Sequence, residues 1–97
     1  MLDIENKTVF KLNESFSLSS FESKKQKYWL FDLNEGNIYR LNTVSYLILS
    51  MLEGKTCFGD IISSVLSQFD DVNKEEIWRD GQEFLTQCLN NGIISIV

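Results

Sequence analysis

Apolar and polar residues alternate along the first part of the chain, the pattern of half-buried β-strands. Residues 16–21 repeat with a period of two, which predicts a strand. Residues 28–33 are rich in aromatic and aliphatic types that suit a pleated sheet, and residues 38–41 follow after a turn sequence centred on Gly36. We therefore expect a three-stranded antiparallel meander over residues 16–41, preceded by an N-terminal arm (residues 1–13) that could contain a short strand at Thr8-Val9-Phe10.

The second half has a different period. Apolar residues recur at intervals of three and four, which predicts three amphipathic helices between residues 43 and 91. The tail, residues 93–97, is strongly β-prone and would form either a short last strand or an exposed apolar end. The helix boundaries follow from capping residues: Asn42 or Thr43 begins the first helix and Gly54 ends it, Thr56 begins the second, and Asn73 begins the third, which stops at Asn91-Gly92.

The order of these elements indicates the fold class. Strands come first and helices second, rather than alternating, which is typical of an α+β fold. A chain of 97 residues has the length of one domain. We expect a single α+β domain spanning residues 1–97, in which a three-stranded antiparallel sheet is followed by a three-helix bundle.

The charge of the chain argues against a nucleic-acid partner. The formal net charge is −5, whereas phosphate binding requires a basic surface. The basic cluster Lys24, Lys25 and Lys27 falls in a predicted turn, where solvated lysines are ordinary. The third predicted helix carries more acidic than basic residues, so it would be a poor recognition helix for DNA.

The sequence contains no recognisable catalytic or metal site. Histidine, the commonest general base, is absent, and no Gly-rich phosphate loop or nucleophile elbow occurs. Cys57 and Cys88 are far apart in apolar neighbourhoods and have no zinc-site spacing. The pattern indicates a protein that is not an enzyme and that uses no cofactor or metal. The N-terminus lacks the features of a signal peptide, and no apolar run could span a bilayer, so we expect a cytoplasmic protein.

An ordered set of short motifs resembles a known family. The first is Tyr39-Arg40-Leu41-Asn42, followed by the run Ile48-x-x-Met51-Leu52-x-Gly54-Lys55-Thr56. Next come Asp60-Ile61-Ile62 and Val65-Leu66-x-x-Phe69. The last is Ile77-x-x-Asp80-x-x-x-Phe84-Leu85-x-x-x-Leu89-x-x-x-Gly92-Ile93-Ile94. Together they are similar to the PqqD-like family, the leader-recognition element of ribosomal-peptide modification systems, over residues 16–94.

The resemblance implies a winged-helix-like domain and a non-catalytic role. Such domains bind the leader of a precursor peptide as an added β-strand, in the groove between the third strand of the meander and the third helix. They act as chaperones that present the leader to a modifying enzyme. Partners of this kind are radical-SAM enzymes, cyclodehydratases, dehydratases and leader proteases.

The binding residues should come from the two walls of that groove. In the strand, Tyr39 and Leu41 share one face, and Ile38 and Arg40 share the other. Either pair could face the core, and Leu41 leading into Asn42 favours Tyr39 and Leu41. In the helix, Trp78 lies beside the apolar stripe, and Gly81 replaces an aliphatic residue of the family pattern. Gly81 opens a hole for a leader side chain, permits close approach of a neighbouring helix, or reflects simple sequence drift. The predicted peptide-binding residues are Asn37, Ile38, Tyr39, Arg40, Leu41, Trp78, Asp80, Gly81, Gln82, Leu85 and Leu89.

Two other functions remain open. A winged-helix DNA-binding protein fits the helical half, although the acidic charge disfavours it. A structural subunit of an oligomeric complex, such as a homodimer, fits an exposed apolar tail.

Overall fold

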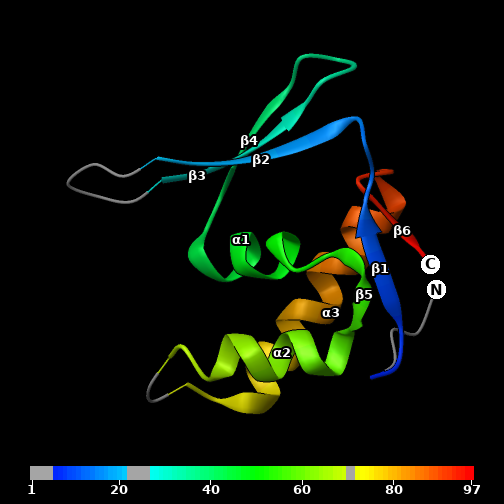
Figure 1. Cartoon of the computed structure of the whole chain (residues 1–97). Helices are drawn as coiled ribbons and strands as arrows, with labels where there is room; N and C mark the ends of the chain where they lie inside the picture. Colours follow the sequence, from blue (N-terminus) through cyan, green and yellow to red (C-terminus); the bar gives the residue numbers. More distant parts are fainter. Residues whose placement is uncertain (1–5, 22–26, 70–71) are drawn as a thin grey trace.

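Two three-stranded antiparallel sheets and three helices make up the described part of the chain, residues 6–21, 27–69 and 72–97 of this computed structural model (Figure 1). The α+β class is confirmed, but the chain has two sheets where the sequence predicted one. Residues 1–5 of the predicted arm, and Lys24 and Lys25, lie outside the described residues. The elements are β1 (Val9–Leu12), β2 (Phe16–Phe21), β3 (Lys27–Asp32), β4 (Ile38–Leu41), α1 (Thr43–Ser50), β5 (Glu53–Cys57), α2 (Phe58–Leu66), α3 (Lys74–Asn90) and β6 (Ile94–Ile96).

The first sheet is the predicted meander, with strand order β2-β3-β4. Tyr28 and Leu30 of β3 are buried and point to the helices. The turn between β3 and β4 has Gly36 at φ +73°, a conformation that other residues rarely adopt. The carboxylate of Asp32, at the end of β3, accepts hydrogen bonds from the backbone N–H groups of Asn34 and Glu35 at 3.0 and 3.2 Å. These features join residues that are close in the sequence, and for that reason the hairpin could be predicted from the sequence.

The second sheet, β5-β1-β6, joins segments that are far apart in the sequence. β1 lies in the centre, so the end of the predicted arm is a strand rather than an appendage. The tail forms β6, paired with β1 through Phe10↔Ile96 and Leu12↔Ile94. β5, between α1 and α2, was not predicted. Consequently Gly54, at φ +81°, lies in β5 and does not end α1, and Thr56 also lies in β5.

Two of the three predicted helix starts are correct. Asn42 caps α1 by accepting a hydrogen bond from the Ser45 N–H at 2.7 Å. Asn73 caps α3 by accepting from the N–H groups of Glu75 and Glu76 at 2.9 and 3.2 Å. The start of α2 was predicted wrongly, because its N-cap is Cys57, with no side-chain hydrogen bond. α3 ends as predicted, at Asn90 with Asn91 as its C-cap.

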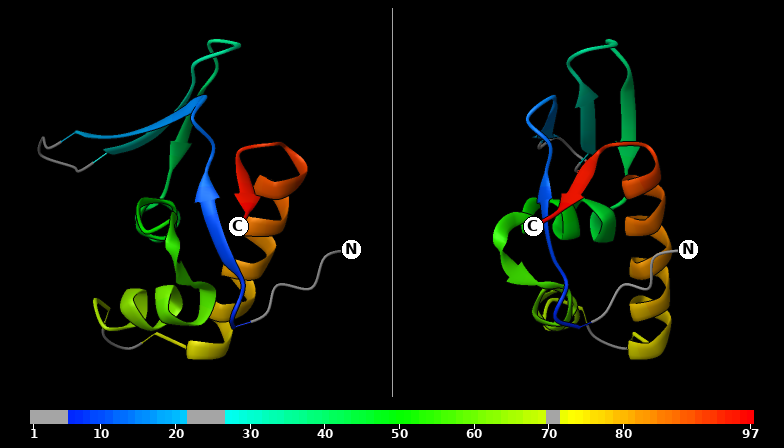
Figure 2. Two further views of the ribbon diagram at one scale, coloured as in Figure 1. Left: turned by 45° about the vertical axis from the view of Figure 1, so that its right-hand side comes forward. Right: turned by 90° about the vertical axis from the view of Figure 1, so that its right-hand side faces the viewer.

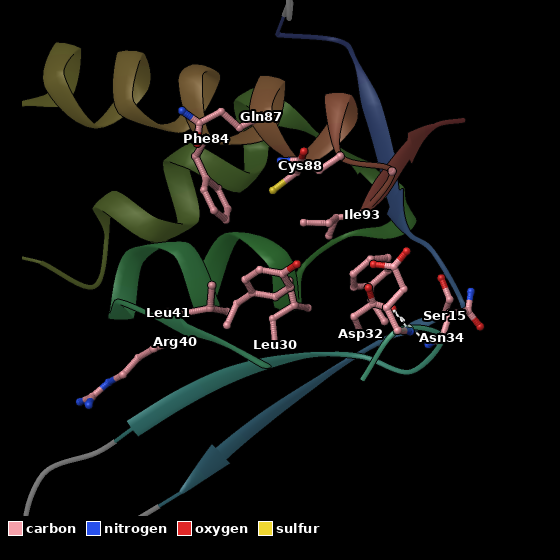
Figure 3. A pocket seen from close by; sticks show the side chains of 15 residues that line it. Ser15, Leu30, Asp32, Asn34, Arg40, Leu41, Phe84, Gln87, Cys88 and Ile93 are labelled. Atoms are coloured by element: carbon pink, nitrogen blue, oxygen red, sulfur yellow. Dashed lines mark hydrogen bonds between the residues drawn. The ribbon is translucent and has the colours of Figure 1, made fainter. Parts of the chain in front are cut away.

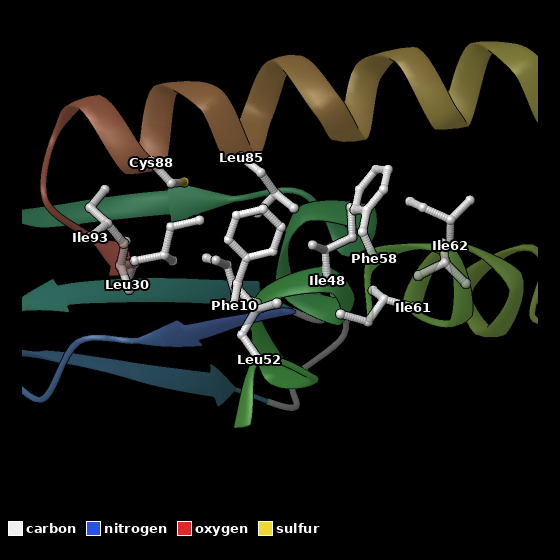
Figure 4. Packing of buried hydrophobic residues seen from close by; sticks show 13 residues of the cluster. Phe10, Leu30, Ile48, Leu52, Phe58, Ile61, Ile62, Leu85, Cys88 and Ile93 are labelled. Atoms are coloured by element: carbon white, nitrogen blue, oxygen red, sulfur yellow. The ribbon is translucent and has the colours of Figure 1, made fainter. Parts of the chain in front are cut away.

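The hydrophobic core lies where the helices meet both sheets (Figure 4). Phe10 of β1 is fully buried and lies among Leu52, Ile48 and Leu85 (Figure 4). The β2-β3-β4 sheet rests on α1 and extends away from the rest of the molecule, whereas α3 runs along one side of the other helices and of the β5-β1-β6 sheet (Figure 2). The C-terminal half of α3 therefore faces the region where β4 leads into α1.

We expect Phe10→Ala to lower the free energy of unfolding by about 3–5 kcal/mol, because a fully buried phenylalanine leaves a cavity that the neighbouring side chains fill only partly. That is a large share of the roughly 5–15 kcal/mol typical of a domain. The matched control is Phe21→Ala, since Phe21 is 64% exposed and its loss should change stability by less than about 0.5 kcal/mol. Urea unfolding followed by circular dichroism measures both. Equal losses from the two substitutions would contradict the central place given to β1.

Candidate functional site

A cavity of about 720 Å³ lies between β4 and the C-terminal half of α3 (Figure 3). Its apolar surface comes from both sides: Leu30, Tyr39 and Leu41 from the sheet, and Phe84 and Cys88 from α3. Polar residues, among them Ser15, Asp32 and Asn34, lie at the end of the cavity next to the turn between β3 and β4 (Figure 3). The full lining is Ser15, Phe16, Leu30, Asp32, Asn34, Glu35, Tyr39, Arg40, Leu41, Phe84, Gln87, Cys88, Asn91, Gly92 and Ile93.

A second cavity, of about 370 Å³, continues the first toward the start of α3. Phe84 and Gln87 line both cavities, so the two form one groove along α3. The opposite wall of the second cavity is the beginning of α1, which follows β4 directly. The lining of the second cavity is Asn42, Val44, Ser45, Ile48, Ile77, Asp80, Gly81, Glu83, Phe84 and Gln87.

β4 is an edge strand, and the register of the sheet indicates which of its backbone groups face outward. The Asp32 N–H donates to the Asn37 carbonyl at 2.8 Å, and the next pairs along are Phe31↔Ile38, Leu30↔Tyr39 and Trp29↔Arg40. In an antiparallel pair, hydrogen-bonded and non-hydrogen-bonded residues alternate. The N–H and C=O groups of Ile38 and Arg40 therefore point away from β3, toward the free edge.

The same register separates the side chains of β4. Tyr39 and Leu41 lie opposite Leu30 and Tyr28, both buried, so they belong to the inner face, as the sequence predicted. Arg40 belongs to the outer face, where its guanidinium lies 5.6 Å from the centre of the Trp29 ring. Figure 3 shows the Arg40 side chain directed away from the cavity, so this residue contributes its backbone to the groove.

One flank of α3 faces the groove, and it is not the flank that the sequence analysis favoured. The buried stripe of the helix is Gly81, Leu85 and Cys88. At 100° per residue, Asp80, Phe84, Gln87 and Asn91 lie about 90° to one side of this stripe, and Trp78, Gln82 and Leu89 lie about 80° to the other. The groove is lined by the first set and by none of the second.

The structure gives Trp78 and Leu85 roles inside the domain. The Trp78 ring packs edge-on against Phe58, with ring centres 4.8 Å apart. Leu85 is fully buried in the core. Neither side chain reaches the groove, and Gln82 and Leu89 lie on the flank away from it. Of the predicted helix residues, only Asp80 and Gly81 line it.

A side chain at the position of Gly81 would point toward α2. A Cβ atom there would lie 3.0 Å from the Ile62 Cδ1 atom and 3.5 Å from the Phe58 ring. The space is therefore already filled, and the prediction of a hole for a leader side chain is wrong. The alternative, close approach of a neighbouring helix, is what the structure shows.

Several groove residues were not among the predicted binding residues. On the flank that faces the groove they are Phe84 and Gln87 of α3 and its C-cap Asn91, and the lining further includes Ile77, Glu83 and Cys88. A signal for Phe84, Gln87 and Asn91 existed, because they share a helical flank with Asp80, which the family motif had identified. Phe84 is also the one large apolar side chain between Asp80 and Asn91 that falls on this flank.

The chemistry of the groove is that of a binding surface. Burial raises the pKa of the Cys88 thiol to about 12, so this cysteine is neutral and unreactive at ordinary pH. Over residues 6–21, 27–69 and 72–97, no three His, Cys, Asp or Glu side chains are grouped closely enough to hold a metal ion. Within the same ranges, every helix is too short or too polar to cross a bilayer.

Comparisons with known proteins bear on the family and the fold. Residues 27–94 match the family described as "Coenzyme PQQ synthesis protein D (PqqD)". The chain is also similar to a solved structure described as "TbiB1 in Complex with the TbiA(beta) Leader Peptide", with a TM-score of 0.66 and 21% sequence identity over 88% of this chain and 94% of that one. At this identity the likeness establishes a shared fold. No curated protein matches the chain.

We expect Gly81→Val to lower the free energy of unfolding by about 1–3 kcal/mol, because its methyl groups would be forced against Ile62 and Phe58. Gly81→Ala is the matched control: its single methyl group needs only a small shift of Ile62, and alanine gains up to about 1 kcal/mol of helix propensity. Urea unfolding of both variants measures the difference. A Gly81→Val protein as stable as the Gly81→Ala protein would show that α2 and α3 pack less closely than described.

We expect Cys88 to resist thiol reagents in the folded protein. In a Cys57→Ser variant, which leaves Cys88 as the one thiol of the chain, a pKa of about 12 makes the thiolate about a thousandfold rarer at pH 8 than in the unfolded chain. Reaction with an aromatic disulfide reagent, followed by absorbance, should be slow in buffer and rapid in urea. The native rate should rise with pH above 8, since a raised pKa delays ionisation. Equal rates in buffer and urea would contradict the burial of this thiol.

Proposed function

Since this chain belongs to the PqqD family, we propose that it is a non-catalytic adaptor that binds the leader of a ribosomally synthesised precursor peptide. In this proposal the leader lies in the groove between β4 and α3 and is presented there to a modifying enzyme in the cytoplasm. The observation that carries the proposal is an outward-facing strand edge beside a cavity with apolar walls. The winged-helix-like arrangement implied by the family belongs to the same proposal.

The free edge of β4 supplies the backbone half of the interaction. A peptide that joins the sheet next to β4 would pair with the N–H and C=O groups of Ile38 and Arg40, a total of four hydrogen bonds. Such bonds do not depend on the peptide's side chains. They fix the direction and register of the peptide.

The cavities supply the selective half. Alternate side chains of an added strand would point inward, against Tyr39 and Leu41 on one wall and Phe84 and Gln87 on the other. Each backbone hydrogen bond contributes about 1 kcal/mol, whereas ordering each peptide residue costs about 1–2 kcal/mol. Affinity must therefore come from apolar side chains buried in the groove, at roughly 1.5–3 kcal/mol each.

The proposed binding residues change accordingly. The strand residues Asn37, Ile38, Tyr39, Arg40 and Leu41 stay as proposed contacts, with Ile38 and Arg40 acting through their backbone. On the helix, Asp80 stays as a proposed contact and Gly81 stays as part of the groove lining. Phe84, Gln87 and the C-cap residue Asn91 replace Trp78, Gln82, Leu85 and Leu89. The class of modifying enzyme, whether radical-SAM enzyme, cyclodehydratase, dehydratase or leader protease, stays open within the proposal.

We expect Arg40→Pro to weaken peptide binding about tenfold, because proline removes an outward N–H and leaves a peptide carbonyl without its donor. Proline is tolerated at such a position of an edge strand. The matched control is Arg40→Ala, which loses the same side chain but keeps the N–H, and should bind almost as well as the wild type. The probe is a peptide selected against the wild-type protein from a random twelve-residue display library, and fluorescence anisotropy gives its affinity.

The same peptide, added to ¹⁵N-labelled protein, tests where binding occurs. Amide shifts should appear in β4 and along the Asp80–Asn91 flank of α3. The proposal is abandoned if the shifts cluster in β1 and β6, or if the two Arg40 variants lose affinity equally.

A further inference from the structure

The two parts of the groove differ in charge. Resting on the proposed function, we infer that the groove selects an extended peptide that carries a basic side chain two positions from an apolar one. The apolar side chain occupies the cavity between β4 and the end of α3, and the basic one occupies the cavity beside Asp80 and Glu83.

Apolar side chains from both walls surround the middle of the first cavity (Figure 3). Leu30, Leu41, Phe84, Cys88 and Ile93 contribute to its lining. Its charged groups are engaged elsewhere or lie at the margin: the carboxylate of Asp32 accepts two turn hydrogen bonds, and the guanidinium of Arg40 lies over Trp29 on the outer face. Glu35 belongs to the turn at the end of the hairpin. An aliphatic or aromatic side chain is the ligand that this cavity suits.

The second cavity has two carboxylates and no lysine or arginine among its lining residues. Asp80 and Glu83 are both exposed, and among the residues that the structure describes neither forms an ion pair. Val44, Ile77 and Phe84 line the same cavity. A lysine or arginine side chain satisfies both features, because its methylene stem packs on apolar surface while its cationic end stays near carboxylates and water.

The spacing between the two cavities sets the spacing in the peptide. The α3 residues that line them are centred about four positions apart, or about 6–7 Å at the rise of a helix. Inward-facing residues of a strand repeat every two positions, about 7 Å, and every four positions, about 13 Å. A separation of two positions therefore fits, and one of four does not.

The direction in which the peptide binds decides whether its basic or its apolar residue comes first in its sequence. Both directions satisfy this spacing. β4 and α3 run in opposite directions along the groove, as the right-hand view of Figure 2 shows. The first cavity therefore lies beside β4 and the second beside the start of α1. A basic side chain thus lies beyond the end of β4, where the peptide leaves the strand edge.

The test is selection from the random twelve-residue display library against three proteins. These are the wild type, the groove variant Asp80→Lys/Glu83→Lys, and the control Glu53→Lys/Glu75→Lys, which makes the same change in net charge at exposed residues outside both cavities. Thermal melts by circular dichroism establish that all three are folded. Affinities of the selected peptides, and of versions with the basic residue changed to glutamate, are measured by anisotropy at 0.05 and 0.5 M salt.

We expect the wild type and the control to enrich lysine or arginine two positions from an apolar residue, and the groove variant to enrich aspartate or glutamate there. Exchange of the basic residue for glutamate should weaken binding to the wild type about threefold to tenfold at low salt, and less at high salt. Peptides enriched without a basic preference, or with the same preference for the wild type and the groove variant, overturn the inference and leave the proposed function standing. Failure to enrich any peptide overturns both.

Discussion

The pairing of β1 between β5 and β6 is the constraint on which the groove depends. β1 leads directly into β2, and β6 follows directly from α3, so this pairing fixes the meander against the end of the helix. Asn13 reinforces the connection, because its backbone N–H donates to the Ile93 carbonyl at 3.0 Å and its side-chain amide donates to the Gly92 carbonyl at 2.6 Å. Its side-chain oxygen accepts from the Ser95 hydroxyl at 2.6 Å. Without β1, the two walls would have no fixed separation.

The two walls then make different contributions to the proposed binding. The edge of β4 offers backbone groups whose hydrogen bonds roughly offset the cost of ordering a peptide, so the edge sets register rather than affinity. α3 supplies side chains, and its buried stripe at Gly81, Leu85 and Cys88 keeps the Asp80–Asn91 flank turned toward β4. The rotation of α3 about its own axis is therefore as important as its position, and close packing of Gly81 against Ile62 holds that rotation.

Local chemistry explains which elements could be predicted. Gly36 at a positive φ, Asn42 and Asn73 as helix caps, and the period-two pattern of β2 all act within a few residues of sequence. The errors occurred where a distant partner overrides local preference. Residues 53–57 contain no apolar alternation, yet they form β5 because β1 offers a free edge; Val9 pairs with Cys57 and Lys11 with Glu53, and the register shifts between these two pairs. Gly54 was predicted to end one helix and Thr56 to begin the next, and both are strand residues for that reason.

The sequence by itself determined the hairpin, the three helices and the family, because each depends on periodicity or on ordered motifs. It favoured Tyr39 and Leu41 as the inward face of β4, and the pairing of these residues with buried Leu30 and Tyr28 decided it. The sequence did not determine which flank of α3 lines the groove. Both flanks carry an aromatic residue, Trp78 on one and Phe84 on the other, and helical periodicity treats them alike. Only the tertiary structure distinguishes them: packing of Phe58 against Trp78 and pairing of β6 with β1 turn the Phe84 flank toward the sheet edge. A helix specifies its buried stripe through its own residues, whereas the neighbours on either side of that stripe are set by contacts far away in the chain.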